Sequence, residues 1–264
     1  MTKIHRQFVE NAIEKIKTDE DAVGLAIGGS WVTGEIDEYS DLDLVLVTKK
    51  KIAPHVEQMT AYANRFGDLL NGFTGEHVGE SRLLICLYDN PLLHVDIKFI
   101  IPDEFHVRVE DPVVVWERND VLTSIIKHSK AEFPYPDYQW IEDRFWIWIH
   151  YAGLKIGRGE LFEALDFCSF MRTNVIASLL QIRHGKLPKA VRKVEFNLSN
   201  HDLMRLKKTI ASHDRESIIN CLEEIIALYT DLRGHLFSNK IRLQSDTERK
   251  SLEYLQSIKS TPHS

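Results

Sequence analysis

The hydrophobic positions in the first half of the chain follow two patterns. Apolar residues recur every three or four positions between residues 5 and 17, which predicts an amphipathic helix. A second helix is predicted over residues 51–70. Short apolar runs, each typical of a strand, lie at residues 23–27, 42–47, 83–88, 94–101 and 113–116. This mixture predicts a small mixed sheet with helices packed on it.

The second half of the chain has a different pattern. Pro134 and Pro136 mark a linker or domain edge, and helical periodicity dominates after them. Helices are predicted at residues 138–156, 160–183, 203–211, 217–236 and 247–258. We therefore predict an α+β protein, with an α/β domain over residues 1–128 and a C-terminal all-α helical bundle over residues 129–264. We expect a cleft between the two domains, a common place for ligands.

A glycine turn follows the first predicted strand. Gly28 and Gly29 lie directly after the apolar run, and Ser30 comes next. Glycine accepts backbone conformations with positive φ and lets the chain approach a ligand closely. The N–H groups after Gly29, together with the Ser30 hydroxyl, are suited to hold a phosphate. A Gly-Gly-Ser sequence is more often a plain turn, so this signal needs a second one.

The second signal is a pair of acids on a buried strand. Asp41 and Asp43 flank Leu42, and alternate residues of a strand share a face, so the two carboxylates are predicted to point the same way. Two unpaired carboxylates in an apolar strand are costly, because burial disfavours each charge and the charges repel. A divalent cation between them removes this cost, and carboxylate oxygens suit Mg²⁺.

Asp96 is the third acid. It alternates with Val95 and Ile97, which places it on the polar face of a later strand. If that strand lies beside residues 42–47, three carboxylates can hold two Mg²⁺, the arrangement used for displacement at phosphorus. The alternative is a turn residue, a salt-bridge partner and a surface acid. Residues 34–47 contain five acids and no Lys or Arg, which disfavours local ion pairs as the explanation.

These residues resemble a known family. Gly29-Ser30, then Asp41-Leu42-Asp43, then Asp96 are similar to the motif of the nucleotidyltransferases of the DNA polymerase β superfamily, most of all its small-molecule branch of aminoglycoside and lincosamide adenylyltransferases. The resemblance implies Gly29 and Ser30 at the nucleotide phosphates and Asp41, Asp43 and Asp96 as catalytic metal ligands. It also implies ATP as donor and two Mg²⁺. Residues 158–165, followed by Arg172, are similar to the family's helical segment beside the acceptor. Trp31 departs from the family pattern.

Several further residues are weaker candidates. A general base takes the proton of the attacking hydroxyl. Glu142 and Asp143 begin a predicted helix near the expected cleft, and Asp143 is our candidate base; the alternative is that both are ordinary acids that stabilise a helix N-terminus. Glu76 and Glu80, near a strand edge, are rival bases. Triphosphate also needs positive charge, for which Lys155, Arg158, Arg172 and Lys98 are candidates, with solvent exposure or ion pairing as the alternative. Trp140, Ile141, Phe145 and Trp148 are predicted to form a core stripe, the alternative being stacking on a substrate ring.

Composition narrows the function further. A net charge of −6 disfavours a nonspecific nucleic-acid binder and suits a cationic acceptor. The three widely spaced cysteines and the lack of a long apolar run favour a cytoplasmic protein without a membrane partner. The prediction is an enzyme that transfers AMP from Mg·ATP to a hydroxyl of a small molecule, plausibly an aminoglycoside-like antibiotic, releasing pyrophosphate. A protein or RNA acceptor, as in a toxin–antitoxin pair, and a catalytically silent nucleotide-binding regulator stay open.

Overall fold

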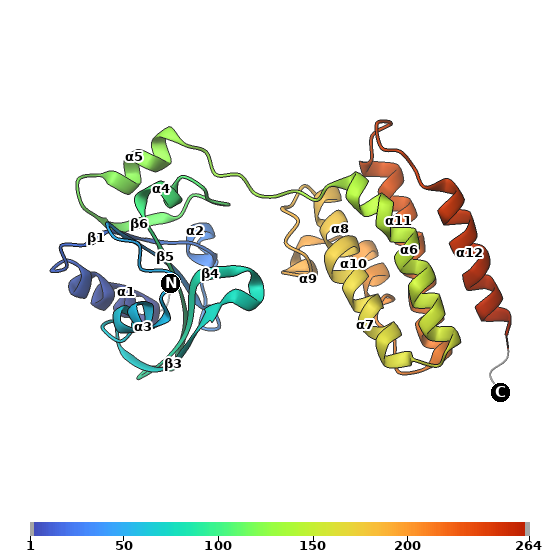
Figure 1. Ribbon diagram of the computed structural model, residues 1–264, viewed down its shortest axis with the longest axis horizontal. Coiled ribbons are helices and arrows are strands. Elements are labelled where there is room, and N and C mark those ends of the chain that lie inside the picture. Colours follow the sequence, from blue (N-terminus) through green and yellow to red (C-terminus); the bar gives the residue numbers. More distant parts are fainter. Residues whose placement is uncertain (1–2, 262–264) are drawn as a thin grey trace. The chain divides into compact units, whose positions relative to one another are not determined.

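The computed structural model describes residues 3–261, and the chain divides into two compact units. The first, here called the sheet unit, ends at Pro134, and the second, the helical unit, begins at Tyr135. Figure 1 shows the strands confined to the sheet unit and the helices after residue 135 gathered in the helical unit. The mixed sheet followed by a helical region confirms the predicted α+β class.

The sheet unit contains a six-stranded sheet in the order β3-β4-β5-β2-β1-β6. Its central pair, β2 and β5, is parallel, and the other neighbours are antiparallel. The strands are β1 (Ala22–Ile27), β2 (Leu42–Thr48), β3 (Asp68–Gly75), β4 (Glu80–Asp89), β5 (Leu93–Ile100) and β6 (Val113–Glu117). The predicted strands therefore appear, with β2 at the centre as its buried apolar pattern indicates.

Helices pack on both faces of the sheet. On one face, α1 (Lys3–Ile16) and α3 (Val56–Ala63) bury a large core against alternate residues of β2, β4 and β5. On the other face, α4 (Pro102–Phe105) and α5 (Val121–His128) cover a smaller core around Val47 and Ile100. The short helices α2 (Ser30–Thr33) and η1 (Glu76–Val78) lie in connections. The smaller core covers only one end of its face.

The prediction of one long helix over residues 51–70 was wrong. The helix α3 spans only Val56–Ala63, and residues 68–75 form the edge strand β3. Pro54 explains the late start, because proline lacks the N–H that a helix interior requires. β3 was missed because its sequence contains Gly72 and Gly75 and shows little apolar alternation. Its pairing with β4 supplies the order that its own pattern lacks.

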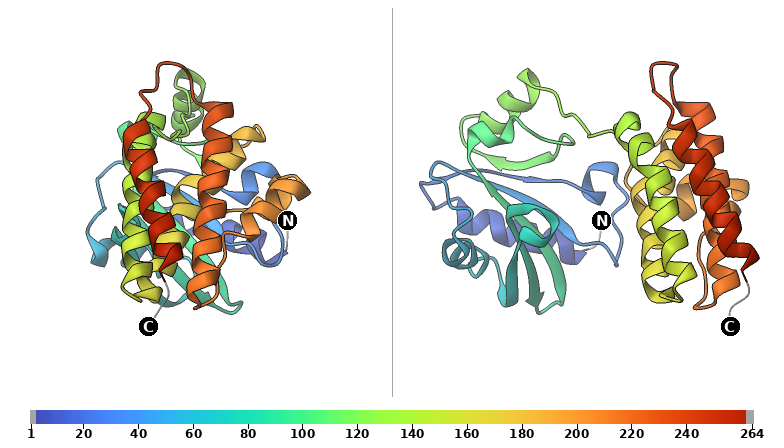
Figure 2. Two further views of the ribbon diagram at one scale, coloured as in Figure 1. Left: turned by 90° about the vertical axis from the view of Figure 1, so that its right-hand side faces the viewer. Right: turned by 45° about the vertical axis from the view of Figure 1, so that its right-hand side comes forward.

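The helical unit buries its own apolar core. Figure 2 shows α6, α11 and α12 running alongside one another, and α6 packs on both α7 and α12. The predicted helix over residues 160–183 is interrupted by a wider π-type turn, η2 (Arg172–Ile176). The helices are α6 (Tyr138–Gly157), α7 (Leu161–Met171), α8 (Ala177–Arg183), α9 (Val194–Asn197), α10 (Asn200–Lys207), α11 (Arg215–Leu236) and α12 (Ser245–Ser260).

The aromatic stripe of α6 differs in part from the prediction. Ile141 and Phe145 are buried as expected, and Phe145 stacks on Tyr229 with ring centroids 3.6 Å apart. Trp140 was predicted in the core but is 46% exposed. Trp146, left out of the predicted stripe, is only 1% exposed. The helix is packed by neighbours on more than one side, so a single stripe underestimates its buried surface.

Candidate functional site

The parallel pairing of β2 and β5 brings two of the predicted acids together. Asp43 and Asp96 are direct partners in the strand register, between the pairs Leu42–Val95 and Leu44–Ile97. Neighbouring strands lie about 4.8 Å apart, and residues in register project to the same face. The Asp43 and Asp96 side chains therefore emerge side by side. These two acids are separated by more than fifty residues in the sequence and meet only through the fold.

Their face of the sheet is only partly covered. Leu42 and Leu44 alternate with Asp43 and lie in the core beneath α1 and α3. On the opposite face, Val45 packs with the smaller core of α4 and α5, whereas Asp43 and Asp96 lie beyond that core and are half-buried. Carboxylates at the uncovered end of a packed face keep access to solvent and to a ligand.

The glycine turn closes one side of this acidic pair. Gly29 has a φ of 61°, a left-handed conformation that favours glycine. An added Cβ at Gly29 would lie 1.9 Å from Oδ2 of Asp43, so no other residue fits there without moving the carboxylate. The N–H of Gly28 donates to the backbone oxygen of Asp43 at 2.9 Å. The turn and the strand acid therefore form one packed arrangement, a closer link than the sequence indicated.

The other predicted residues of the sheet unit lie next to this pair. Asp41 directly precedes β2 and is half-buried, and Ser30 opens α2 immediately after the turn. The His94 side chain, on the same strand as Asp96, contacts the Asp96 carboxylate with Nε2 to Oδ1 at 2.9 Å. The sequence alone gives His94 no role, since a lone histidine is more often a hydrogen-bonded structural residue. In this geometry it orients Asp96.

These residues fit a divalent cation in part. Within residues 3–261, no three His, Cys, Asp or Glu side chains are grouped closely enough to hold a metal ion as they stand. Asp43 and Asp96 nevertheless supply an in-register pair of the hard oxygen ligands that Mg²⁺ prefers. Asp41 lies two residues before Asp43, is half-buried, and is the candidate third ligand. The in-register pair thus fits a cation, and the role of Asp41 stays a prediction.

Lys98 and the rival bases are engaged elsewhere. Lys98 pairs with Glu80 at 2.8 Å. Of the two roles considered for Lys98, ion pairing and phosphate binding, the structure contains the ion pair. Hydrogen bonds from Arg82, and then from Lys98, lower the pKa of Glu80 to about 2. A hydrogen bond from Thr74 lowers the pKa of Glu76. A carboxylate with a lowered pKa takes up a proton poorly near neutral pH, which disfavours both as general bases.

Glu110 is a site residue that the sequence analysis missed. The N–H of Gly29 donates to Oε1 of Glu110 at 2.6 Å, and the same oxygen lies 3.0 Å from where a Cβ of Gly28 would be. Glu110 lies in the connection between α4 and β6, 81 residues from Gly29. No local motif surrounds it, so only the fold reveals its place.

Glu142 and Asp143, the two candidate general bases of the helical unit, both form hydrogen bonds within that unit. Glu142 is fully buried and accepts hydrogen bonds from Tyr229, Arg233 and the Gln244 amide, so it does not face a cleft as expected. Asp143 accepts from the side-chain amides of Gln139 and Gln244, and these bonds lower its pKa. A lowered pKa weighs against Asp143 as the catalytic base, although its role is still a prediction.

The cationic candidates of the helical unit are paired within that unit. Lys155 contacts Glu160 at 2.8 Å and Glu163 at 2.9 Å, and these bonds raise its pKa. Arg158 pairs with Glu160 at 3.0 Å. Arg172 donates to the Thr209 backbone oxygen at 2.7 Å, which ties η2 to the end of α10. Nucleotide binding by Lys155 or Arg158 therefore requires exchange of an existing ion pair.

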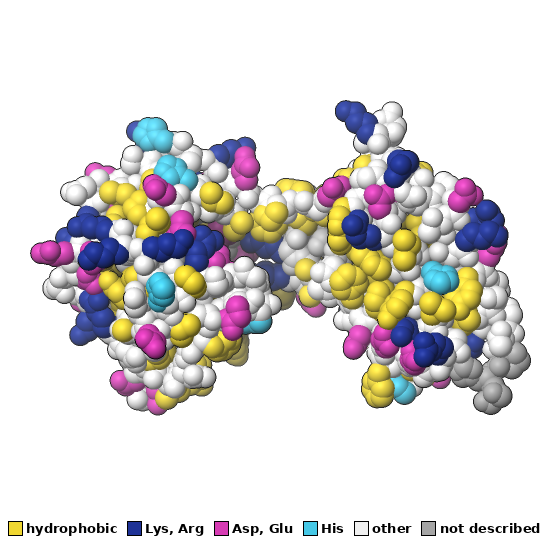
Figure 3. Space-filling view, viewed as in Figure 1, with side chains coloured by type: hydrophobic (Ala, Val, Ile, Leu, Met, Phe, Trp, Pro, Cys, Tyr) yellow, Lys and Arg dark blue, Asp and Glu magenta, His cyan; other side chains and the backbone are white. Residues whose placement is uncertain are grey.

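An exposed aromatic surface remains on the helical unit. The Trp140 and Trp148 rings pack edge to face with centroids 5.6 Å apart, and Trp148 continues to Phe170 at 5.2 Å. Arg144 lies over the Trp140 ring at 4.3 Å. Figure 3 shows hydrophobic side chains gathered over α6 and α7, while acidic and basic side chains are interspersed on the sheet unit. Stacking on a substrate ring stays open for Trp140 and Trp148.

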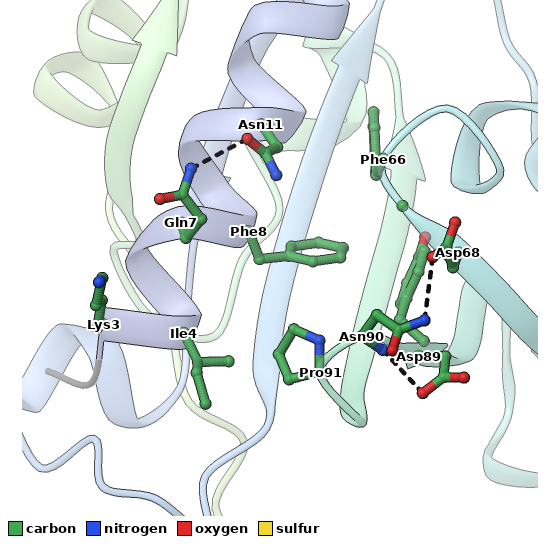
Figure 4. A pocket seen from close by; sticks show the side chains of 12 residues that line it. Lys3, Ile4, Gln7, Phe8, Asn11, Phe66, Asp68, Asp89, Asn90 and Pro91 are labelled. Carbon is green, nitrogen blue, oxygen red and sulfur yellow. Dashed lines mark hydrogen bonds between the residues drawn. The ribbon is translucent and has the colours of Figure 1, made fainter.

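A separate cavity lies between α1 and the β4–β5 turn. Its volume is about 370 Å³, with Phe8, Phe66 and Tyr88 as an apolar floor. Figure 4 shows Asp68, Asp89 and Asn90 at its rim, where Asn90 bonds both acids. None of the predicted site residues lines it. We place the site at the carboxylates, because the rim acids of this cavity are engaged with Asn90 and none of the predicted site residues reaches it.

Comparisons with known proteins found only distant structural likeness. Neither a protein-family model nor a characterised protein sequence matches the chain. An aminoglycoside 6-adenyltransferase from Bacillus subtilis is similar at 13% identity and a TM-score of 0.40, over 96% of this chain and 97% of that one. A nucleotidyltransferase-like protein from Exiguobacterium sibiricum 255-15 is similar at 12% identity and a TM-score of 0.37, over 98% and 82%. Within residues 3–261, no helix is long and apolar enough to cross a membrane.

Proposed function

We propose that the protein is a Mg²⁺-dependent nucleotidyltransferase that moves AMP from ATP to a hydroxyl group of a small molecule. The observation that supports this most is the register of β2 and β5, which sets Asp43 beside Asp96 on a half-buried face. The Gly28–Gly29 turn packs directly against the Asp43 carboxylate, which places the glycine-serine segment beside the acidic pair. The order of these residues along the chain resembles the nucleotidyltransferase motif.

In this proposal each residue has a defined task. Asp41, Asp43 and Asp96 would hold two divalent ions, which when bound supply the positive charge that phosphoryl transfer requires. Gly29 leaves room for the Asp43 carboxylate beside the proposed phosphate position, and the Ser30 hydroxyl would donate to the phosphates. His94 keeps the Asp96 carboxylate oriented through its 2.9 Å contact. Asp143 stays a candidate general base, and Lys155 and Arg158 stay candidates for binding the triphosphate.

The proposed reaction balances as a single displacement at phosphorus. The acceptor hydroxyl oxygen forms a bond to the α-phosphorus while the bond from that phosphorus to the bridging oxygen breaks. Pyrophosphate leaves, and the hydroxyl proton passes to a base. The net charge of −6 suits an acceptor with amino groups, since an acidic protein attracts cationic ligands. An aminoglycoside-like antibiotic has both the hydroxyls and the positive charge.

The test uses ATP labelled at the α-phosphate with a panel of aminoglycosides, other hydroxylated small molecules, RNA and cell protein. We expect label on a small acceptor, pyrophosphate in equal amount, and a loss of both in Asp43→Asn. Asp103→Asn, an exposed residue in the same unit, is the matched control and should keep full activity. Transfer that persists in Asp43→Asn, or binding of Mg·ATP without any pyrophosphate release, would rule the proposal out. If label appeared only on RNA or on protein, the acceptor would be that macromolecule and not a small molecule.

A further inference from the structure

One segment of the sheet unit has no task in the proposed reaction yet reaches its site. Residues 106–112 connect α4 to β6 and bring the Glu110 carboxylate onto the glycine turn. The Gly29 N–H donates to Oε1 of Glu110 at 2.6 Å. A hydrogen bond to a carboxylate is shorter and roughly twice as strong as one between neutral groups. The contact therefore ties two distant parts of the chain at the point where Asp43 also lies.

This connecting segment is itself held firmly, by Arg108. The Arg108 side chain is 7% exposed and pairs with Asp111 at 2.6 Å. Its guanidinium also donates to the Ser129 hydroxyl at 2.7 Å and to the Ser129 backbone oxygen at 2.9 Å. The Arg108 backbone oxygen accepts from the Glu132 N–H at 2.9 Å. Glu110, two residues away, thus extends from a fixed support.

The glycine turn needs such a support. Glycine explores both signs of φ, so a Gly-Gly sequence does not hold one conformation by itself. Here one amide of the turn is tied to the Asp43 backbone and the next to Glu110. The Asp43 carboxylate fills the space beside the Gly29 Cα, 1.9 Å from the Cβ that glycine lacks. A displaced Gly29 would therefore change where the Asp43 carboxylate can lie.

We propose that Glu110 is a positioning residue of this site, which holds the glycine turn against Asp43 through the Gly29 amide and thereby fixes the Asp43 carboxylate. The inference rests on the proposed function for its effect on catalysis. Its structural part, the dependence of Asp43 on Glu110, stands separately. The carboxylate acts as a hydrogen-bond acceptor at a set distance, so both its reach and its accepting oxygen matter.

Three variants separate reach from charge. Glu110→Gln keeps the length and the accepting oxygen but removes the charge, Glu110→Asp keeps the charge but shortens the side chain, and Glu110→Ala removes both. Glu132→Gln, an exposed acid of the same unit, is the control for charge. We measure kcat and KM for ATP, the Mg²⁺ concentration at half-maximal rate, Mn²⁺ affinity without nucleotide, and the amide resonance of Gly29.

Positioning predicts a specific pattern. A misplacement of about 1 Å in a catalytic group costs about 100-fold in rate, so Glu110→Asp and Glu110→Ala should lose about 10- to 100-fold in kcat. Their Mn²⁺ affinity should fall, the Mg²⁺ requirement should rise, and the Gly29 amide should shift, with KM for ATP little changed. Glu110→Gln should stay within about threefold of the unaltered protein. Glu132→Gln should behave as the unaltered protein.

Other outcomes overturn the inference. A loss in Glu110→Gln with activity retained in Glu110→Asp would mean that charge, not position, matters. Tighter ATP binding without loss of rate in Glu110→Ala would mean that Glu110 competes with phosphate for the turn. A protein without any transfer activity would end the proposed function, while Mn²⁺ affinity and the Gly29 resonance would still decide the inference. Because Glu110→Gln and Glu110→Asp are both small changes, a folding defect in Glu110→Ala alone leaves the comparison intact.

Discussion

The acids of the two units are held in contrasting ways. In the helical unit, Glu142 is fully buried and meets Tyr229 and Arg233, so its charge is neutralised inside the fold. In the sheet unit, Asp43 and Asp96 lie in register on a partly covered face, against a glycine turn and a histidine. An acid surrounded by buried donors stabilises structure, whereas two acids in register on a partly covered face are placed to bind a cation. The surroundings of a carboxylate therefore distinguish structural from functional acids better than the presence of an acidic residue alone.

Asp202 supports the same distinction. It is buried in the helical unit and meets Arg183 at 2.5 Å and His184 at 2.7 Å. Although burial opposes ionisation, the hydrogen bonds from His184 and Arg183 lower the pKa of Asp202. Every partner lies within the helical unit, so the arrangement needs no external ligand. We therefore assign Asp202, like Glu142, to the fold.

The largest effects are expected at the in-register pair. Asp43→Asn and Asp96→Asn should each lower the transfer rate by about 10²–10³-fold or more, because each removes charge placed for the reaction. The double variant should lose little beyond either single one, since the two act as a unit. Thermal unfolding should change little, because both side chains are only half-buried and asparagine keeps their size. Additive losses measured by steady-state kinetics would contradict a shared task.

Glu142 should show the opposite behaviour. Glu142→Gln leaves Arg233 without one of its buried acidic partners and should destabilise the protein by about 2–4 kcal/mol in urea unfolding. Glu253→Gln on α12, whose side chain is 53% exposed in its ion pair, should cost less than about 0.5 kcal/mol. Under conditions where both variants are folded, kcat should match the unaltered protein. A stable but inactive Glu142→Gln would contradict the assignment of Glu142 to structure alone.

Substitution of Asp143 tests whether an acid at the start of α6 takes part in catalysis. The hydrogen bonds from Gln139 and Gln244 lower its pKa, so we expect Asp143→Asn to keep the rate within about threefold. A general base contributes about 10²–10⁴-fold, and its loss also removes the acidic limb of the pH–rate profile. A loss of that size in Asp143→Asn, together with a changed profile, would restore Asp143 as the base.

The smallest effect concerns Glu80. Its folded pKa of about 2 lies below the ordinary value of 4.5, so its contacts with Arg82 and Lys98 stabilise the fold above pH 4.5, and this stabilisation is lost as pH falls towards 2. Glu80→Gln should therefore be less stable than the unaltered protein at pH 7, by about 1 kcal/mol or less for a partly exposed pair. The difference should shrink as pH falls below 4.5 and vanish only below pH 2. A difference independent of pH would indicate lost packing instead.

Much of the fold could be predicted from local patterns. The buried run of β2, the alternation in β5 and the helices of the second half are strong periodic signals, and the structure has all of them. β3 escaped prediction because an edge strand with glycines takes its order from its partner strand. The predicted helix over residues 51–70 is too long, because Pro54 prevents an earlier start and the chain enters β3 at Asp68.

The site was predictable only where its residues are close in sequence or share a strand pattern. Asp43 and Asp96 could be paired in advance because their strands show clear alternation and adjacent placement was a plausible topology. Glu110 could not, because a contact over 81 residues between a connecting segment and a turn has no periodic signal. Nor could the sequence show that Glu142 is internal and that Lys155 is paired, since both depend on packing within the helical unit.

The most direct measurement counts divalent cations at the in-register acids. Mn²⁺ binding is followed by electron paramagnetic resonance with a non-hydrolysable ATP analogue, in the unaltered protein, Asp43→Asn, Asp96→Asn and the Asp103→Asn control. The account predicts two bound Mn²⁺ per chain in the unaltered protein and the control, with at least one lost in each of the other variants. Saturable Mn²⁺ binding that is unchanged in both Asp43→Asn and Asp96→Asn, or no saturable Mn²⁺ binding at all, would contradict the account.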